Sequence, residues 1–328
     1  MKIRADISPA PLPPSLERIL QDHRASRAFD PAAYLEQKVE LIDRYFDSYN
    51  LDTAVVGISG GIDSAVVLGI LAAAESVQTV VPVMLPASGH SGVTGQNEAL
   101  SRGHDVCSVF GYQPVILDVA TAARTIDETV AEGLNTLLPL ESSSWGSGQL
   151  VSYTRTPFLY YVATMLHDNG HRAVIAGTTN YSEGSYLGYI GKASDAMVDV
   201  QLISDLYKSE VYALAEHLGV PESICSAAPT GDMFDACTDE EVFGATYDFV
   251  ELFLEYLNDR AAENCDLTPW VTRVSKEDQD YFTRHAQSLK ALHQANKHKY
   301  LAGSPAVHLD VRRFPLNVWK IQTWKKEN

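Results

Sequence analysis

The part of this sequence best suited to chemistry is a turn rich in glycine and serine, residues 57–64, which reads Gly-Ile-Ser-Gly-Gly-Ile-Asp-Ser. A β-branched apolar run, residues 53–58, leads into it, and an apolar helical stretch follows at once. Small residues in such a turn let successive backbone N–H groups converge on an anion at the helix N-terminus. The paired glycines allow close approach of the backbone, and the serine hydroxyls add donors. Phosphate is therefore the expected ligand.

Asp63 is the unusual residue of this turn. A carboxylate among phosphates repels them unless a cation lies between, so Asp63 predicts Mg²⁺ with a nucleotide. The spacing fits neither the G-x-x-x-x-G-K-[ST] loop nor the G-x-G-x-x-G fingerprint. A plain Gly/Ser turn that ends in an N-cap residue is the structural alternative.

The elements around the turn alternate between strand and helix. Apolar spacing predicts helices over residues 34–49, 94–110 and 156–167, and strands over residues 53–58, 79–85, 114–117 and 173–176. Further helices are expected over residues 208–218, 239–257 and 277–293. Residues 143–148 are expected to form a flexible loop that closes over the site. Alternation of this kind predicts an α/β protein with a doubly wound, mostly parallel sheet, of the Rossmann-like type.

The chain is expected to hold one domain. Residues 1–30 carry four prolines and are predicted to form an extended N-terminal arm. Residues 31–328 contain no internal repeat and no long linker, so they are predicted to form a single domain.

Composition narrows the function. The net charge of −17 over 328 residues argues against nucleic acid as a partner. No apolar run approaches the roughly 20 residues of a membrane span, and the N-terminus lacks the apolar centre of a signal peptide, so we expect no membrane partner and a cytoplasmic location. The cysteines show no paired C-x-x-C spacing, which argues against a zinc site or a redox motif.

The turn resembles a known motif. Ser-Gly-Gly-x-Asp-Ser at this place is similar to the signature of the N-type ATP pyrophosphatases, of the adenine-nucleotide α-hydrolase fold type. These enzymes cleave ATP between the α and β phosphates and adenylate a carbonyl or carboxylate oxygen. The resemblance implies ATP binding by Gly57, Ile58, Ser59, Gly60, Gly61, Ile62, Asp63 and Ser64.

A second segment narrows the family. Residues 177–183 resemble the G-T-x-x-x-x-E segment of ammonia-dependent NAD synthetases. The resemblance implies that Glu183 joins Asp63 as a Mg²⁺ ligand, and that Thr178, Lys208 and Thr230 bind ATP. Physically, a carboxylate after a second parallel strand faces the same crevice as Asp63. The predicted catalytic residues are Asp63, Glu183 and Lys208.

The substrate side resembles the family less closely. By resemblance, the dinucleotide would be bound by Tyr153, Arg155, Lys192, Asp199, His298 and Lys299. The family has an R-x-R pair where this chain has Tyr153-Thr154-Arg155.

The reaction implied is the ATP- and Mg²⁺-dependent amidation of deamido-NAD with ammonia to NAD, AMP and pyrophosphate, through an adenylated carboxylate. The resemblance also implies a homodimer. The change at Tyr153 leaves open a related amide ligase that adenylates a different carboxylate. Two further alternatives are less favoured: tRNA thiolation by the acidic charge, and a nucleotide sensor without catalysis by the presence of both Asp63 and Glu183.

Overall fold

The computed structural model describes residues 5–89, 95–138, 143–230, 237–263, 270–299 and 306–316. Within these ranges six parallel strands form one sheet in the order β3-β2-β1-β4-β5-β6. The strands are β1 Thr53–Gly57, β2 Thr79–Met84, β3 Val115–Ile116, β4 Ala173–Gly177, β5 Val200–Gln201 and β6 Val307–His308. The chain runs outward from β1 to β3 and returns to β4 on the other side of β1. This reversal creates a switch point between β1 and β4, where open α/β sheets bind ligands.

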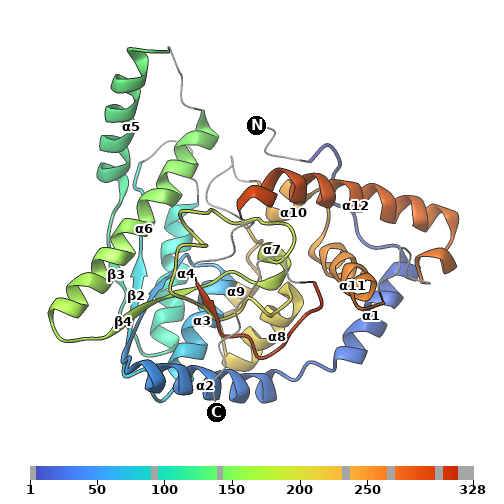
Figure 1. Ribbon diagram of the computed structural model, residues 1–328, viewed down its shortest axis with the longest axis horizontal. Helices are drawn as coiled ribbons and strands as arrows, with labels where there is room; N and C mark the ends of the chain where they lie inside the picture. The colour runs from blue at the N-terminus through green and yellow to red at the C-terminus, as the bar shows by residue number, and fades with distance from the viewer. Residues whose placement is uncertain are drawn as a thin grey trace.

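Helices cover both faces of the sheet (Figure 1). Alternate residues of β1 point to opposite layers: Ala54 and Val56 pack towards α2, α3, α4 and α8, whereas Val55 packs towards α5 and α6. The helices of the first layer are α2 Pro31–Tyr49, α3 Ile62–Ala73, α4 Gln96–Val109 and α8 Lys208–Leu218, and those of the second are α5 Ala120–Asn135 and α6 Ser144–Asp168. The doubly wound α/β fold predicted from the sequence is therefore confirmed.

A separate helical cluster lies beside the sheet. Its helices are α1 Pro14–Arg27, α10 Asp239–Phe243, α11 Tyr247–Glu263 and α12 Lys276–Asn296. The short helices α7 Tyr181–Gly184, α9 Glu222–Cys225, η1 Val271–Arg273 and η2 Lys297–Lys299 complete the described elements.

Helix α1 corrects the extended conformation predicted for the N-terminal arm, which is wrong for residues 14–27. Pro14 stands at the first helical position, where its missing N–H costs nothing, so the proline run starts a helix. Leu16 and Leu20 then point to one side, and both are buried in the cluster with α11.

Two further expectations are wrong in detail. Helix α6 begins twelve residues earlier than predicted and includes most of the expected flexible loop, because the Ser143 hydroxyl caps it by accepting the Gly146 N–H at 3.1 Å. The helix expected over residues 239–257 is divided into α10 and α11, because Gly244 ends α10 in the left-handed region at φ 66°. None of the described helices is long and apolar enough to cross a membrane.

Candidate active site

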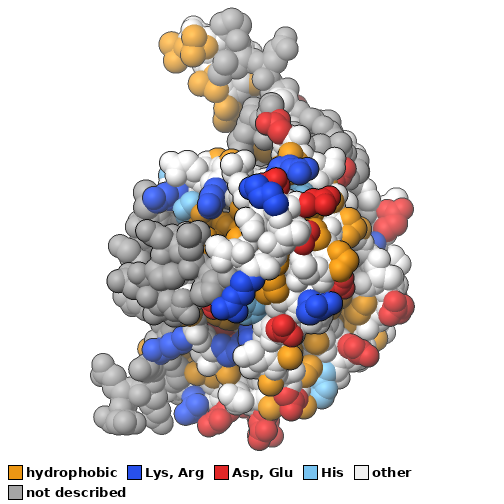
Figure 2. Space-filling model, turned by 90° about the vertical axis from the view of Figure 1, so that its right-hand side faces the viewer, with side chains coloured by type: hydrophobic (Ala, Val, Ile, Leu, Met, Phe, Trp, Pro, Cys, Tyr) orange, Lys and Arg blue, Asp and Glu red, His pale blue; other side chains and the backbone are white. Residues whose placement is uncertain are grey.

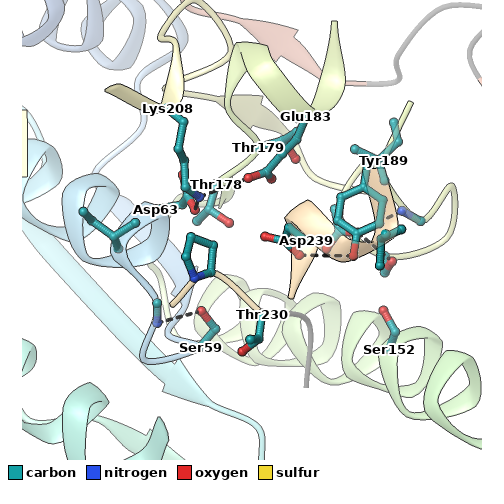
Figure 3. A pocket seen from close by; sticks show the side chains of 18 of the residues that line it. Ser59, Asp63, Ser152, Thr178, Thr179, Glu183, Tyr189, Lys208, Thr230 and Asp239 are labelled. Atoms are coloured by element: carbon teal, nitrogen blue, oxygen red, sulfur yellow. Dashed lines mark hydrogen bonds and ion pairs between the residues drawn. The ribbon is translucent and has the colours of Figure 1, made fainter. Parts of the chain in front are cut away.

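A cavity of about 320 Å³ opens at the carboxyl ends of β1 and β4. The glycine-rich turn after β1 forms one wall, the loop after β4 and the start of α8 form the next, and α6 closes the opposite side. In Figure 3 Lys208, Thr178 and Glu183 reach into this space, and Ser152 stands across it on α6. The cavity thus lies at the switch point of the sheet.

The turn after β1 requires glycine at position 60. Gly60 has φ +79°, and a Cβ there would lie 2.2 Å from the carbonyl oxygen of Ala99. Arg102 Nε donates to the Gly60 carbonyl at 2.9 Å and so fixes the turn against α4. Ser59 lines the cavity, whereas Ser64 is buried beneath the turn and donates to the Gly61 carbonyl at 3.0 Å. The described turn therefore offers Ser59 and backbone groups to a ligand, while Ser64 holds its shape.

A charged cluster joins three of the predicted residues. Lys208 Nζ lies 2.5 Å from Asp63 Oδ2 and 3.0 Å from Glu183 Oε1. Asn180, the N-cap of α7, donates through Nδ2 to Asp63 at 2.9 Å and to Glu183 at 2.8 Å. Two loops and one helix start are thereby tied together by one amine and one amide.

Burial and charge set the protonation of this cluster. Although burial lowers it, the neighbouring carboxylates of Asp63 and Glu183 raise the pKa of Lys208 above its usual value, so the amine stays charged. Burial raises the pKa of Asp63. For Glu183 burial acts in the same direction, but the Lys208 charge and the Tyr247 hydroxyl outweigh it and lower the pKa. The site holds a permanent cation beside two acids.

A third acid, Asp239 at the start of α10, lines the cavity and was not predicted. Tyr189 donates to Asp239 Oδ1 at 3.2 Å, and the Tyr247 hydroxyl lies 2.9 Å from Oδ2 and 2.7 Å from Glu183 Oε1. Burial and the nearby Glu183 charge raise the pKa of Asp239 to about 6. The sequence showed only a capping box here, Thr238 with Glu241, which predicts a helix start and no chemistry.

A second cavity of about 170 Å³ adjoins the first. Its walls are largely apolar and come from the carboxyl ends of β1 and β2, from α4 and from α6. Gly57, Ile58 and Arg155 line it, and Arg155 Nε donates to the Leu85 carbonyl at 3.0 Å. A flat, mainly apolar ring fits such a slot better than a phosphate does.

The predicted substrate residues do not converge in one chain. Lys299 lines the main cavity and donates to the Ile190 carbonyl at 2.8 Å. Lys192 and His298 are exposed and do not line it, and Asp199 accepts the Ile175 N–H of β4 at 2.7 Å. Tyr153 is 43% exposed.

Helix α6 supplies cavity residues that were not predicted, because its first turns were expected to form a loop. Trp145, Gln149 and Ser152 follow one another at helical spacing and all line the main cavity. Tyr153, one position further on, does not line this cavity, and its hydroxyl donates to Gln149 Oε1 at 3.0 Å. Thr178 and Thr230, the other two residues predicted to bind ATP, also line the cavity.

Fold and site together define a doubly wound α/β protein whose switch point carries a glycine-rich turn, two acids and a buried lysine. The chain belongs to the NAD synthase family, whose model matches residues 34–300. It is 32% identical over 219 residues to the NH(3)-dependent NAD(+) synthetase of Methanococcoides burtonii, covering 66% of this chain and 76% of that protein. It is 30% identical over 246 residues to the corresponding synthetase of Thermoplasma volcanium, covering 74% and 93%.

The fold has solved counterparts. The structure of an NMN synthetase from Francisella tularensis matches with a TM-score of 0.63 at 21% identity, covering 83% of this chain and 96% of that one. This likeness supports the fold alone.

Proposed function

We propose that the protein is an ammonia-dependent NAD synthetase, which adenylates the nicotinate carboxylate of deamido-NAD with ATP and lets ammonia displace AMP. The observation that carries the proposal is the joining of Asp63, Glu183 and Lys208 at the switch point, inside the part of the chain that matches the family. This is the set of charges that attack at a phosphate requires.

ATP is assigned to both cavities. The apolar slot beside Gly57 and Ile58 suits the adenine ring, and the turn at Ser59 and Gly60 suits the phosphates. Lys208, together with Thr178 and Thr230 on the wall of the same cavity, would hold the charge on the phosphates. The reaction asks for little acid–base chemistry, because the residues mainly hold two anions in line and neutralise them.

Mg²⁺ is the proposed cofactor. Asp63 and Glu183 place carboxylate oxygens 2.5 and 3.0 Å from the same Lys208 nitrogen, so a donor set of the kind Mg²⁺ prefers is already assembled around a cation. When bound, the ion would offset phosphate charge.

A homodimer is proposed because Tyr153 is exposed and because an apolar face of the chain lies open beside it. Helices α5 and α6 pack together and expose apolar side chains along their outer face: Ile126, Val130, Leu134, Tyr161 and Met165, each between 39% and 66% exposed. In Figure 2 the projection that stands above the body carries hydrophobic side chains, at the height that α5 reaches in Figure 1, whereas charges of both signs alternate below it. A second copy of the chain that covers this face would bring its own surface to the exposed Tyr153 on α6.

An amide ligase for a different carboxylate is the second candidate. Tyr153 stands where the family has arginine, and its hydroxyl is bound to Gln149. The cytoplasmic location and the lack of a nucleic-acid partner stay predictions from the sequence.

The test is to incubate the protein with ATP, Mg²⁺, ammonium and deamido-NAD and to follow AMP, pyrophosphate and NAD by chromatography, with Asp63→Asn as the control. We expect NAD and AMP in equal amounts, and neither from the variant. If AMP forms only when another acid, such as nicotinate mononucleotide, replaces deamido-NAD, the second candidate is correct. Formation of ADP instead of AMP would contradict both.

A further inference from the structure

Two segments outside the family match meet at the start of α8. Helix α1 precedes residue 34, and the segment after β6, residues 309–316, follows residue 300. Both contact residues that flank Lys208, the first residue of α8. The amine that holds Asp63 and Glu183 is therefore set from parts of the chain that the family model does not include.

Glu210 is the point where the two segments converge. Arg312, after β6, donates through Nη1 to Glu210 Oε1 at 2.7 Å and through Nη2 to Oε2. Arg27, the last residue of α1, donates through Nε to the same Oε1 at 3.3 Å. The Glu210 side chain is only 4% exposed, and these two guanidinium groups are the ion-pair partners that a buried carboxylate requires.

Glu210 in turn fixes the helix start. Its Oε2 accepts the Tyr207 N–H at 2.9 Å, which satisfies a backbone donor at the N-cap of α8. The guanidinium of Arg27 also lies over the Tyr207 ring, 4.5 Å from its centroid. Lys208 lies between Tyr207 and Ser209 in the chain. Each of these neighbours makes a hydrogen bond to a glutamate, so the backbone of Lys208 is held on both sides.

Two neighbouring residues are held by the same segments. Asp205 accepts the N–H groups of Val311 and Arg312 at 2.9 and 3.0 Å. Ser209 donates to Glu251 Oε2 at 2.7 Å, and Glu251 is paired with Arg27. The chain from residue 205 to residue 210 is thus anchored at several points around Lys208.

We propose that Glu210, clamped by Arg27 and Arg312, is a positioning residue that holds the Lys208 amine in place for ATP. The N-terminal helix and the segment after β6 then belong to the working site and do more than stabilise the fold. This inference rests on the proposed role of Lys208 towards the phosphates. Small displacements of a charged group at a reacting centre are costly, so the clamp acts on catalysis through geometry.

The test compares Arg27→Ala, Arg312→Ala and Glu210→Gln in the full chain, with Ser15→Ala as the matched control. Ser15 lies at the opposite end of the same helix from Arg27 and donates to Asp278 on α12. For the three clamp variants we expect kcat/KM for ATP to fall by about tenfold with KM for deamido-NAD unchanged, because only the phosphate side moves. Ser15→Ala is expected to leave both constants unchanged.

A double variant separates positioning from folding. Arg312→Ala leaves a buried carboxylate with one cation fewer, so its thermal midpoint should drop, and adding Glu210→Gln should restore the midpoint without restoring kcat/KM for ATP. Should a clamp variant fail to fold, Arg27→Lys and Arg312→Lys keep the charge but lose the forked geometry, and they should show the same loss in smaller size.

The clamp proposal is overturned if these variants change only thermal stability and keep the wild-type kinetic constants below their midpoints, or if restoring the midpoint also restores kcat/KM for ATP. Failure of the proposed function looks different. In that case the wild-type protein itself would form no NAD from ATP, ammonium and deamido-NAD, whatever the clamp variants do.

Discussion

The two sides of the main cavity are built in different ways. On the nucleotide side, the turn after β1, the loop after β4 and the start of α8 already place Asp63, Glu183 and Lys208 within 3.0 Å contacts in a single chain. On the acid-substrate side, Lys299 reaches the cavity, but Lys192 and His298 point to solvent. The first side is complete in one chain, and the second is not.

This difference follows from what fixes each residue. A residue beside a buried strand inherits the strand's position, so the carboxyl ends of β1 and β4 are enough to define the nucleotide side. Residues on exposed loops and at the surface of α6 are set by whatever packs on them. We expect that partner to be a second copy of the chain.

The largest effect is expected from Lys208→Met. Without its amine the acids Asp63 and Glu183 and the phosphates lose a buried positive charge that Mg²⁺ alone does not replace, so AMP formation should fall by about 1000-fold. Lys299→Met, on the acid side, should mainly raise KM for deamido-NAD. Chromatographic rates for both variants check this, and an equal loss of kcat in the two would break the division between the sides.

Substitutions at the adjacent glycines Gly60 and Gly61 test whether the turn on the nucleotide side binds the phosphates. Gly60→Ala puts a methyl group 2.2 Å from the Ala99 carbonyl oxygen at φ +79°, whereas Gly61→Ala meets only the Ser59 hydroxyl at 3.3 Å. ATP affinity, measured by calorimetry, should weaken about 100-fold in the first variant and only a few-fold in the second. The opposite order would mean that this turn does not bind the phosphates.

The acid side should depend on subunit contact. Val130→Glu charges the exposed apolar face of α5, where Val130 is 51% exposed, and should give a monomer. In that monomer KM for deamido-NAD should rise about tenfold while ATP affinity is unchanged. Light scattering and kinetics test this, with the exposed Arg124→Glu on the same helix as the control. A monomeric wild-type protein with full activity would refute the dimer.

The last prediction concerns Asp239 and the stability of the fold, with no change in catalysis expected from it. Its pKa is raised to about 6 in the folded state, above the roughly 3.9 of an unfolded chain, so folding favours the protonated acid. Stability from this group is present below about pH 4 and is lost as pH rises to about 6. In Mg²⁺-free protein Asp239→Asn should remove that loss and raise the free energy of unfolding at pH 7 by at most about 3 kcal/mol. Denaturant titrations at about pH 4 and at pH 7 measure this change in the free energy of unfolding, with the exposed Asp22→Asn as the control.

The sequence could predict what depends on one strand, turn and helix. The turn at residues 57–64, the strands on either side of the switch point and the start of α8 were all placed correctly, because their patterns are local. Family resemblance then selected Glu183 among many loop acids, and the structure brings it to Lys208.

The sequence could not predict what depends on distant contacts. Asp239 becomes part of the site through Tyr247, whose hydroxyl also bonds Glu183, 64 residues away in the chain. Helix α1 forms because Leu16 and Leu20 find a partner in α11, which the proline-rich composition did not indicate. The short strands β5 and β6 hold two residues each, too few to show a pattern.

The central claim is that the nucleotide side transfers AMP to a carboxylate oxygen. The most direct test uses deamido-NAD whose nicotinate carboxylate carries a heavy oxygen isotope, with ATP, Mg²⁺ and ammonium, and analyses the products by mass spectrometry. We predict that one heavy oxygen appears in AMP and none in pyrophosphate, because the bond to the α-phosphate forms before ammonia enters. Heavy oxygen in pyrophosphate, or AMP that carries none, would contradict the account.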